Sequence, residues 1–303
     1  MPRVSVVMPA YNARQTIGAS IESVLAQTMD EWELIVVNDG STDGTDESVR
    51  PYLSDTRIRL LSQSNQGVAE ARNRAIREAR GAWIAFLDSD DLWHPFKLEK
   101  QLRRLADERA KMCCTGREIF VHSPGDLPPE TQRAVSDEIR IEDLLRGNFL
   151  TLSSVVIERK MLARLGGFDP DLFGTEDWDL WIRALAFTRI VCIDEPLTLY
   201  REHPAGISKN LRRHLKEKYK VLRKHVETNE MLPAALRREI MWKYRLQSGM
   251  FAVKESERGE ALACCAYCLA RRPFRRATLA LVFRTAEMLL FAAVRPARSN
   301  GCV

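Results

Sequence analysis

Short apolar runs alternate with helix-like segments in the N-terminal part of this chain. Four of these runs have the aliphatic and β-branched character of buried strands: Val4–Met8, Glu33–Val37, Arg57–Leu61 and Trp83–Leu87. Between them, apolar residues recur at helical spacing, as they do over residues 17–25. Strands that alternate with helices pair in parallel, with helices on both faces. The sequence therefore predicts an α/β fold built on a doubly wound, mostly parallel sheet.

An acidic turn, Asp88-Ser89-Asp90-Asp91, follows the fourth run directly. The carboxyl ends of strands in such a sheet face a ligand-binding crevice. Two aspartates one residue apart cannot both be desolvated there without a cation, so Asp88 and Asp90 predict a divalent metal that carries phosphate oxygens. The alternative is a solvated acidic turn before the next helix, with Asp91 as the cap of that helix.

Polar and aromatic residues also follow the first two predicted strands. Pro9, Tyr11 and Asn12 come after the first, and Asp39 comes after the second. At the edge of the crevice, Tyr11 would stack on a flat ring that Asn12 hydrogen-bonds, and Asp39 would accept a hydrogen bond from a base N–H or a ribose hydroxyl. The alternative is that proline and asparagine are ordinary turn residues here.

Arg72 lies on the predicted helix that leads into the fourth strand. It would reach a diphosphate or hold Asp88 in place, although a lone helical arginine more often faces solvent. The chain has neither a G-x-G-x-x-G fingerprint nor a P-loop. A metal ion must therefore contribute more to phosphate binding.

A second acidic group begins a later helix. Thr175 is a suitable N-cap, and Glu176 and Asp177 would occupy the first turn, where the helix dipole keeps a carboxylate ionised. An ionised carboxylate at the edge of a pocket can act as a general base toward a hydroxyl group. The alternative is that these residues only cap the helix.

Composition places the chain among intracellular globular proteins. Its 303 residues are 45% hydrophobic, and the odd number of cysteines, seven, has no metal-finger spacing. The first strand follows Met1 almost at once, which leaves no room for a secretory signal. We therefore expect a cytoplasmic protein with reduced thiols.

Charge divides the chain into two regions. Residues 206–303 contain 21 Lys+Arg and 8 Asp+Glu, whereas residues 1–205 contain 25 and 33. The basic tail is expected to be helical, and Arg271–Arg276 precedes an apolar segment that Arg284 and Glu287 interrupt, too short for a clear membrane span. The tail suits binding to the anionic inner face of the plasma membrane, and the alternative is a helical bundle that packs on the first region or on a second subunit. A nucleic-acid partner is not expected, because no RNA- or DNA-binding motif accompanies the charge.

Taken in order, these motifs resemble the family 2 glycosyltransferases of the GT-A fold, the Rossmann-like fold of nucleotide-diphospho-sugar transferases. Bacterial members that build surface polysaccharides are the most similar. The matching stretches are Val4–Asn12, Val36–Thr45, Asn65–Asn73, Ala82–Asp91, Gly166–Asp169 and Glu176–Trp181. The resemblance implies a catalytic domain over residues 1–205 and a helical extension over 206–303.

The resemblance also implies roles for individual residues. Pro9, Tyr11, Asn12, Asp39 and Arg72 would surround the nucleotide, and Asp88, Ser89 and Asp90 would form the D-x-D motif that reaches the ribose and Mg²⁺ or Mn²⁺. Asp177 would be the general base, Glu176 and Trp178 would meet the acceptor, and His203 would lie near the metal or the diphosphate.

The implied reaction is an inverting sugar transfer from a nucleotide-sugar donor, with a UDP-sugar expected, to a hydroxyl of a saccharide or lipid-linked acceptor. Two alternatives stay open. One is transfer to polyprenyl phosphate, an acceptor that is already an anion and needs no base. The other is a protein that binds a nucleotide sugar or tethers to a membrane without turnover.

Overall fold

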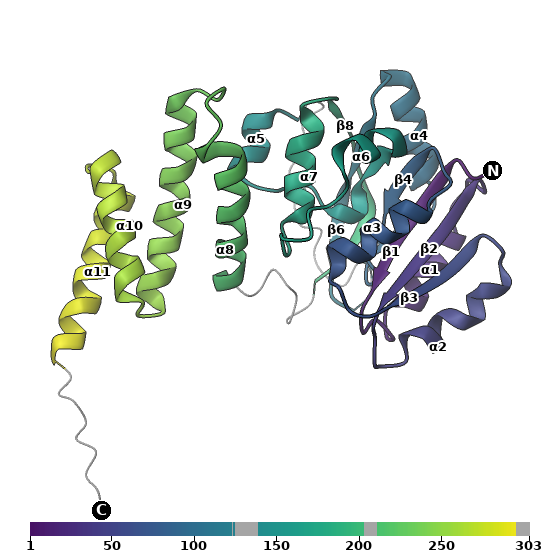
Figure 1. Cartoon of the computed structure of the whole chain (residues 1–303), viewed down its shortest axis with the longest axis horizontal. Coiled ribbons are helices and arrows are strands. Elements are labelled where there is room, and N and C mark those ends of the chain that lie inside the picture. The colour runs from purple at the N-terminus through teal and green to yellow at the C-terminus, as the bar shows by residue number, and fades with distance from the viewer. Residues whose placement is uncertain (123, 125–138, 203–210, 295–303) are drawn as a thin grey trace, which may run out of the picture. The chain divides into compact units, whose positions relative to one another are not determined.

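A computed structural model of the chain describes residues 1–122, 124, 139–202 and 211–294 (Figure 1). The chain divides into two compact units, Met1–Asn210 and Leu211–Val303. An eight-stranded sheet organises the first unit, and helices make up the described part of the second.

Four parallel strands form one half of the sheet, in the order β3-β2-β1-β4. They are β1 (Val4–Ala10), β2 (Trp32–Asp39), β3 (Ile58–Gln63) and β4 (Trp83–Phe86). Every residue of β1 and β2 is buried, as expected for strands covered on both faces. The predicted strands and their parallel pairing are confirmed.

The other half of the sheet is mixed. Beyond β4 the order is β7-β6-β8-β5, where β6 and β8 are parallel and the pairs β4/β7, β6/β7 and β5/β8 are antiparallel. These strands are β5 (Leu92–Trp93), β6 (Met112–Phe120), β7 (Val156–Glu158) and β8 (Ile190–Arg201). The antiparallel strand β7 therefore separates the two parallel groups.

Helices cover both faces of this sheet. They are α1 (Ile17–Leu25), α2 (Thr45–Val49), η1 (Arg50–Ser54), α3 (Val68–Glu78), α4 (Lys97–Glu108), α5 (Ile141–Arg146), η2 (Leu152–Ser154), α6 (Arg159–Leu165) and α7 (Glu176–Leu185). On one face, Met8 packs in a core with Ile21 of α1 and Leu102 of α4. On the other, the ring of Phe86 lies 6.0 Å from that of Trp181 in α7. Successive side chains along each strand point to opposite faces of the sheet, so they contribute to two separate cores.

A close backbone approach ties α3 to the turn that precedes α7. Asn73 donates through Nδ2 to the carbonyl of Phe168 and accepts from the N–H of the same residue, both at 2.9 Å. A Cβ on Gly167 would lie 2.5 Å from Asn73 Oδ1, and the backbone there has φ +75°. Glycine is therefore required at 167, and the pairing fixes where α7 starts.

The second unit contains α8 (Leu211–Leu222), the π-helical turn η4 (Arg223–Glu227), α9 (Ala234–Lys254), α10 (Arg258–Arg271) and α11 (Arg276–Val294). The prediction that the tail is helical is confirmed for its described residues. Its core contains Trp242, Leu281 and the buried, free thiols of Cys264, Cys265 and Cys268. The C-x-x-C pair therefore serves packing. Within residues 1–122, 124, 139–202 and 211–294, no helix is both long and apolar enough to cross a bilayer.

Candidate active site

A buried arginine joins the two acidic groups that the sequence singles out. Arg72, only 4% exposed, donates to Asp88 Oδ1 at 2.7 Å and to Glu176 Oε1 at 2.6 Å. Burial lowers the pKa of Arg72, but the charges of Asp88 and Glu176 outweigh it and leave the pKa above its ordinary value. The prediction that Arg72 holds Asp88 is confirmed, and the solvent-facing alternative is wrong.

Asp177 follows Glu176 in the first turn of α7 and is half-buried. Its Oδ2 accepts a hydrogen bond from Asn148 Nδ2 at 2.8 Å, and its Oδ1 accepts from the N–H of Trp178 at 2.6 Å. Burial raises the pKa of Asp177 to about 7, and the charge of Glu176 adds to the increase, while Arg72 and these hydrogen bonds oppose it. The helix dipole was expected to keep this carboxylate ionised, but burial and Glu176 leave it only partly ionised near neutral pH. A group with this pKa is instead matched to proton transfer near neutral pH.

We expect the pH dependence of catalysis to report this carboxylate. A general base acts in its deprotonated form, so kcat/KM should rise with pH through about 7 and level off above it. Replacing Asn148 with alanine removes a bond that favours the ionised form and should move the rise to higher pH. A profile of kcat/KM that stays flat across this range in both proteins would contradict the assignment.

Hydrogen bonds with Ser153 and Arg201 hold the acidic turn after β4 in place. Ser153 Oγ donates to Asp91 Oδ2 at 2.5 Å and accepts from the N–H of Asp88 at 3.0 Å, and the N–H of Arg201 donates to Asp91 Oδ1 at 2.9 Å. Asp91 is 1% exposed, and burial together with the charges of Asp90 and Asp88 raises its pKa well above the ordinary value. The prediction that Asp91 caps the next helix is wrong, because Leu92–Trp93 pairs with β8 and α4 begins only at Lys97.

The chemistry of this turn fits a hard divalent cation. Asp88, Ser89 and Asp90 are half-buried, and carboxylate oxygens are the ligands that Mg²⁺ and Mn²⁺ prefer. Burial raises the pKa of Tyr200 to about 12, and the charges of Asp91, Asp88 and Asp90 add to the increase. Among the described residues, no three His, Cys, Asp or Glu side chains form a ready metal cluster. His203, predicted to lie near the metal, falls outside the described residues.

The predicted nucleotide-binding residues meet at the same edge of the sheet. Asp39, 3% exposed, accepts from Gln63 Nε2 and from the N–H groups of Gln66 and Gly67, each at 2.8 Å. The Asp39 carboxylate therefore anchors the loop before α3. Its predicted bond to a base or ribose stays a prediction.

The loop after β1 is stabilised by the conformation and the hydrogen bonds of Asn12. Asn12 adopts a left-handed conformation (φ 52°), and its Oδ1 accepts from the N–H of Thr42 at 2.9 Å. Pro9 is buried in β1, opposite Val37 of β2. Tyr11 is 54% exposed and leaves its ring available for stacking. The roles of Pro9, Tyr11 and Asn12 in nucleotide binding stay predictions.

Two predicted acceptor contacts are not supported by the geometry. Trp178 is 2% exposed and donates through Nε1 to the carbonyl of Leu144 at 2.7 Å. Glu176 is 3% exposed and pairs with Arg72. Both side chains face inward because α7 packs on α5 and on the sheet, so neither presents a surface to a sugar. The Thr175 hydroxyl likewise makes no cap bond, although Thr175 is the N-cap residue.

Sequence reasoning missed Asn148 and Ser153, because a polar residue in a loop carries no signal of its own partner. Only the folded position of α5 and its following loop identifies these residues.

The fold and the site together define a GT-A glycosyltransferase: a parallel sheet half ending in a D-x-D turn, linked through a buried arginine to a carboxylate at the start of a later helix. The sequence model described as "Glycosyl transferase family 2" matches residues 5–164, and that described as "Glycosyltransferase like family 2" matches residues 133–248. The chain belongs to glycosyltransferase family 2.

Curated relatives agree with this assignment. A putative teichuronic acid biosynthesis glycosyltransferase of Bacillus subtilis, TuaG, is 34% identical over 213 residues, which cover 69% of this chain and 82% of that protein. The Escherichia coli UDP-Glc:α-D-GlcNAc-diphosphoundecaprenol β-1,3-glucosyltransferase WfgD is 36% identical over 229 residues, covering 74% and 87%.

Solved structures share the fold at lower sequence identity. S. aureus TarS 1-349 in complex with UDP-GlcNAc has a TM-score of 0.69 at 18% identity, over 95% of this chain and 88% of that one. The mannosyltransferase PcManGT from Pyrobaculum calidifontis, in complex with GDP-Man and Mn²⁺, has a TM-score of 0.60 at 21% identity, over 96% and 88%.

Proposed function

We propose that this enzyme is a metal-dependent inverting glycosyltransferase that moves a sugar from a UDP-sugar to a hydroxyl of a lipid-linked saccharide in cell-surface polysaccharide synthesis. The observation that carries the proposal is the buried bridge from Asp88 through Arg72 to Glu176. This bridge brings Asp88 close to the first turn of α7, which bears Asp177, and that proximity supports the proposal. Binding without turnover would not require a carboxylate whose pKa is tuned to about 7.

In the proposed reaction, Asp177 removes the proton from the acceptor hydroxyl, and the oxygen attacks the anomeric carbon from the face opposite the diphosphate. The bond from that carbon to the diphosphate oxygen breaks, and the nucleoside diphosphate leaves with the electron pair. A single displacement inverts the configuration. Asp88 and Asp90 would hold Mg²⁺ or Mn²⁺, which neutralises the leaving diphosphate.

The substrate classes follow from the relatives. WfgD uses UDP-Glc and a diphosphoundecaprenol-linked sugar by its name, TarS was solved with UDP-GlcNAc, and PcManGT was solved with GDP-Man and Mn²⁺. Two of these three donors carry UDP, which supports a UDP-sugar here. A saccharide hydroxyl is favoured over polyprenyl phosphate as the acceptor because a phosphate nucleophile would leave Asp177 without a proton to remove.

Release of UDP from a panel of UDP-sugars tests this function. With Mn²⁺ and a lipid-linked or soluble saccharide acceptor, we expect one donor to release UDP together with a glycosylated product. Removal of the metal with EDTA and the substitution Asp90→Ala should each lower the rate by about a hundredfold or more, because the charge on the leaving group is then no longer balanced. If EDTA-treated and metal-loaded enzyme turned over equally, metal dependence would be wrong.

We also propose that the protein works at the cytoplasmic face of the membrane, where the second unit adsorbs to anionic lipid. Phe274 and Phe283 are 92% and 65% exposed, and Arg275 and Arg276 lie between them in the sequence. Exposed aromatic and basic side chains together suit the surface of an anionic bilayer. Flotation with phosphatidylglycerol vesicles at low salt should recover the protein, and neutral vesicles should not.

A further inference from the structure

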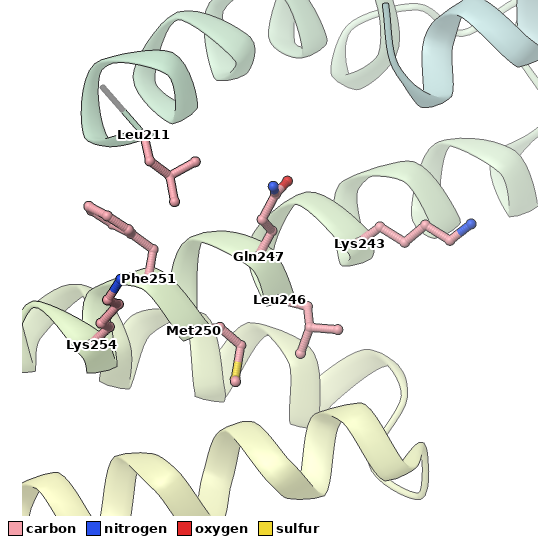
Figure 2. A pocket seen from close by; sticks show the side chains of 7 residues that line it. All are labelled: Leu211, Lys243, Leu246, Gln247, Met250, Phe251 and Lys254. Carbon is pink, nitrogen blue, oxygen red and sulfur yellow. The ribbon is translucent and has the colours of Figure 1, made fainter. Parts of the chain in front are cut away.

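The second unit contains a pocket of about 460 Å³ that the reaction chemistry does not use. Six of its lining residues lie on successive turns of α9, and the seventh, Leu211, faces them from the start of α8 (Figure 2). The α9 residues are Lys243, Leu246, Gln247, Met250, Phe251 and Lys254. This volume lies within the range of sites that bind small ligands.

The lining is apolar in its middle and cationic at both ends. Figure 2 shows Leu246, Met250 and Phe251 between Lys243 and Lys254, which are eleven residues apart and therefore separated by about 17 Å along the helix axis. Leu246 and Met250 also pack on the core of this unit, so the floor of the groove is fixed. None of the described residues that line the groove is acidic.

Positive charge in and beside this groove is incompletely balanced. Lys254 is exposed and has no ion pair within the described part of the chain, whereas Lys243 pairs with Glu239 at 2.8 Å. Lys218 of α8 does not line the groove but donates to the lining residue Gln247, at 3.3 Å from its Oε1, and burial lowers the pKa of Lys218. A cation that is partly desolvated without a carboxylate favours a bound anion.

We propose that this groove binds the prenyl diphosphate carrier of the acceptor, with the isoprenoid chain on Leu246, Met250 and Phe251 and the diphosphate at Lys254. The inference rests on the proposed lipid-linked acceptor. A branched hydrocarbon chain next to two phosphates matches an apolar floor with cationic ends. Holding the carrier on the second unit raises the effective concentration of the attached sugar for the catalytic unit.

Binding of farnesyl diphosphate to the full-length protein, measured by calorimetry with UDP present to occupy the nucleotide site, tests this assignment without turnover. We expect farnesyl diphosphate to bind at least about tenfold more tightly than inorganic diphosphate, because only the former covers the apolar floor. Phe251→Asp and Lys254→Glu should each weaken binding by about tenfold. Leu262→Asp, a comparable apolar-to-acidic change at a 48% exposed position of α10, should leave it unchanged.

Unchanged binding in Phe251→Asp and Lys254→Glu, with native thermal unfolding, would overturn the proposal. Equal binding of inorganic diphosphate, or displacement of farnesyl diphosphate by phosphatidylglycerol vesicles, would also overturn it, because the groove would then take free phosphate or bulk lipid. In turnover assays, Lys254→Glu should raise KM for a prenyl-linked acceptor and leave kcat/KM for its lipid-free analogue unchanged. If instead the proposed function were wrong, the assays would give a different result, because the wild type would transfer sugar to neither the prenyl-linked nor the lipid-free acceptor.

Discussion

Asp177→Asn should lower kcat by a factor of about a thousand while the enzyme still binds its donor. The amide has nearly the same shape and keeps a hydrogen bond with Asn148, but it cannot accept the proton of the acceptor hydroxyl. General-base catalysis contributes about 10² to 10⁴ in rate, and the loss should appear in kcat more than in the KM for the donor. Initial rates over a range of UDP-sugar concentrations measure both.

Asp107→Asn provides a matched control for this substitution. Asp107 lies on α4 with its side chain 70% exposed and makes only a 4.0 Å ion pair with Arg103, so its loss should leave the rate unchanged. If Asp177→Asn retained the wild-type rate, the transfer to polyprenyl phosphate, which needs no base, would become the better account.

Arg72→Met should have the largest effect on stability. It leaves Glu176, with a side chain 4% exposed, and Asp88 without their shared cation. Removing one partner of a buried ion pair costs about 3–5 kcal/mol, because a buried charge is left uncompensated. Urea unfolding should therefore show a lower free energy of unfolding, and the variant should lose transfer activity as well.

A second substitution separates the buried charge from the lost packing of Arg72. Adding Glu176→Gln to Arg72→Met removes the unpaired carboxylate and should restore part of the lost stability. Arg77→Ala, which breaks an exposed 2.7 Å pair with Glu70 on the same helix, should cost about 1 kcal/mol or less. If Arg72→Met and Arg77→Ala had the same free energy of unfolding, the Asp88–Arg72–Glu176 bridge would not stabilise the fold.

The sequence correctly located several candidate site residues at strand ends, and their roles in binding stay predictions. Asp39, Asp88 and Asp90 follow buried apolar runs, and the parallel pairing of those strands brings their carboxyl ends to one edge of the sheet. The same alternation of strands and helices predicted the parallel pairing, whereas the strand order came only from the structure. Local patterns were sufficient here because each strand is short and covered on both faces.

Contacts between distant segments could not be read from the sequence. The direction of Trp178 depends on how α7 packs on α5, and the partner of Asp91 is a serine 62 positions later. The ionisation of Asp177 was misjudged for a similar reason. The helix dipole is a local property, whereas burial and the charge of Glu176 depend on the folded site.

The antiparallel strand β7 was likewise not predicted as such. Val155, Val156 and Ile157 have the β-branched character of a strand, but the preceding Ser153 and Ser154 belong to η2, where Ser153 supports both Asp88 and Asp91. A buried serine that satisfies three polar groups is favoured there over strand pairing, because unpaired buried polar groups are costly. The D-x-D turn therefore depends on a segment that is remote in sequence.

The configuration of the product tests the central claim most directly. With an α-linked UDP-sugar as donor, the account predicts a β-linked product, because the hydroxyl that Asp177 deprotonates attacks in a single displacement. The coupling constant of the anomeric proton in the NMR spectrum of the purified product distinguishes the two linkages. A β-linked product formed by the wild type and lost in Asp177→Asn is the expected result, and an α-linked product would contradict it.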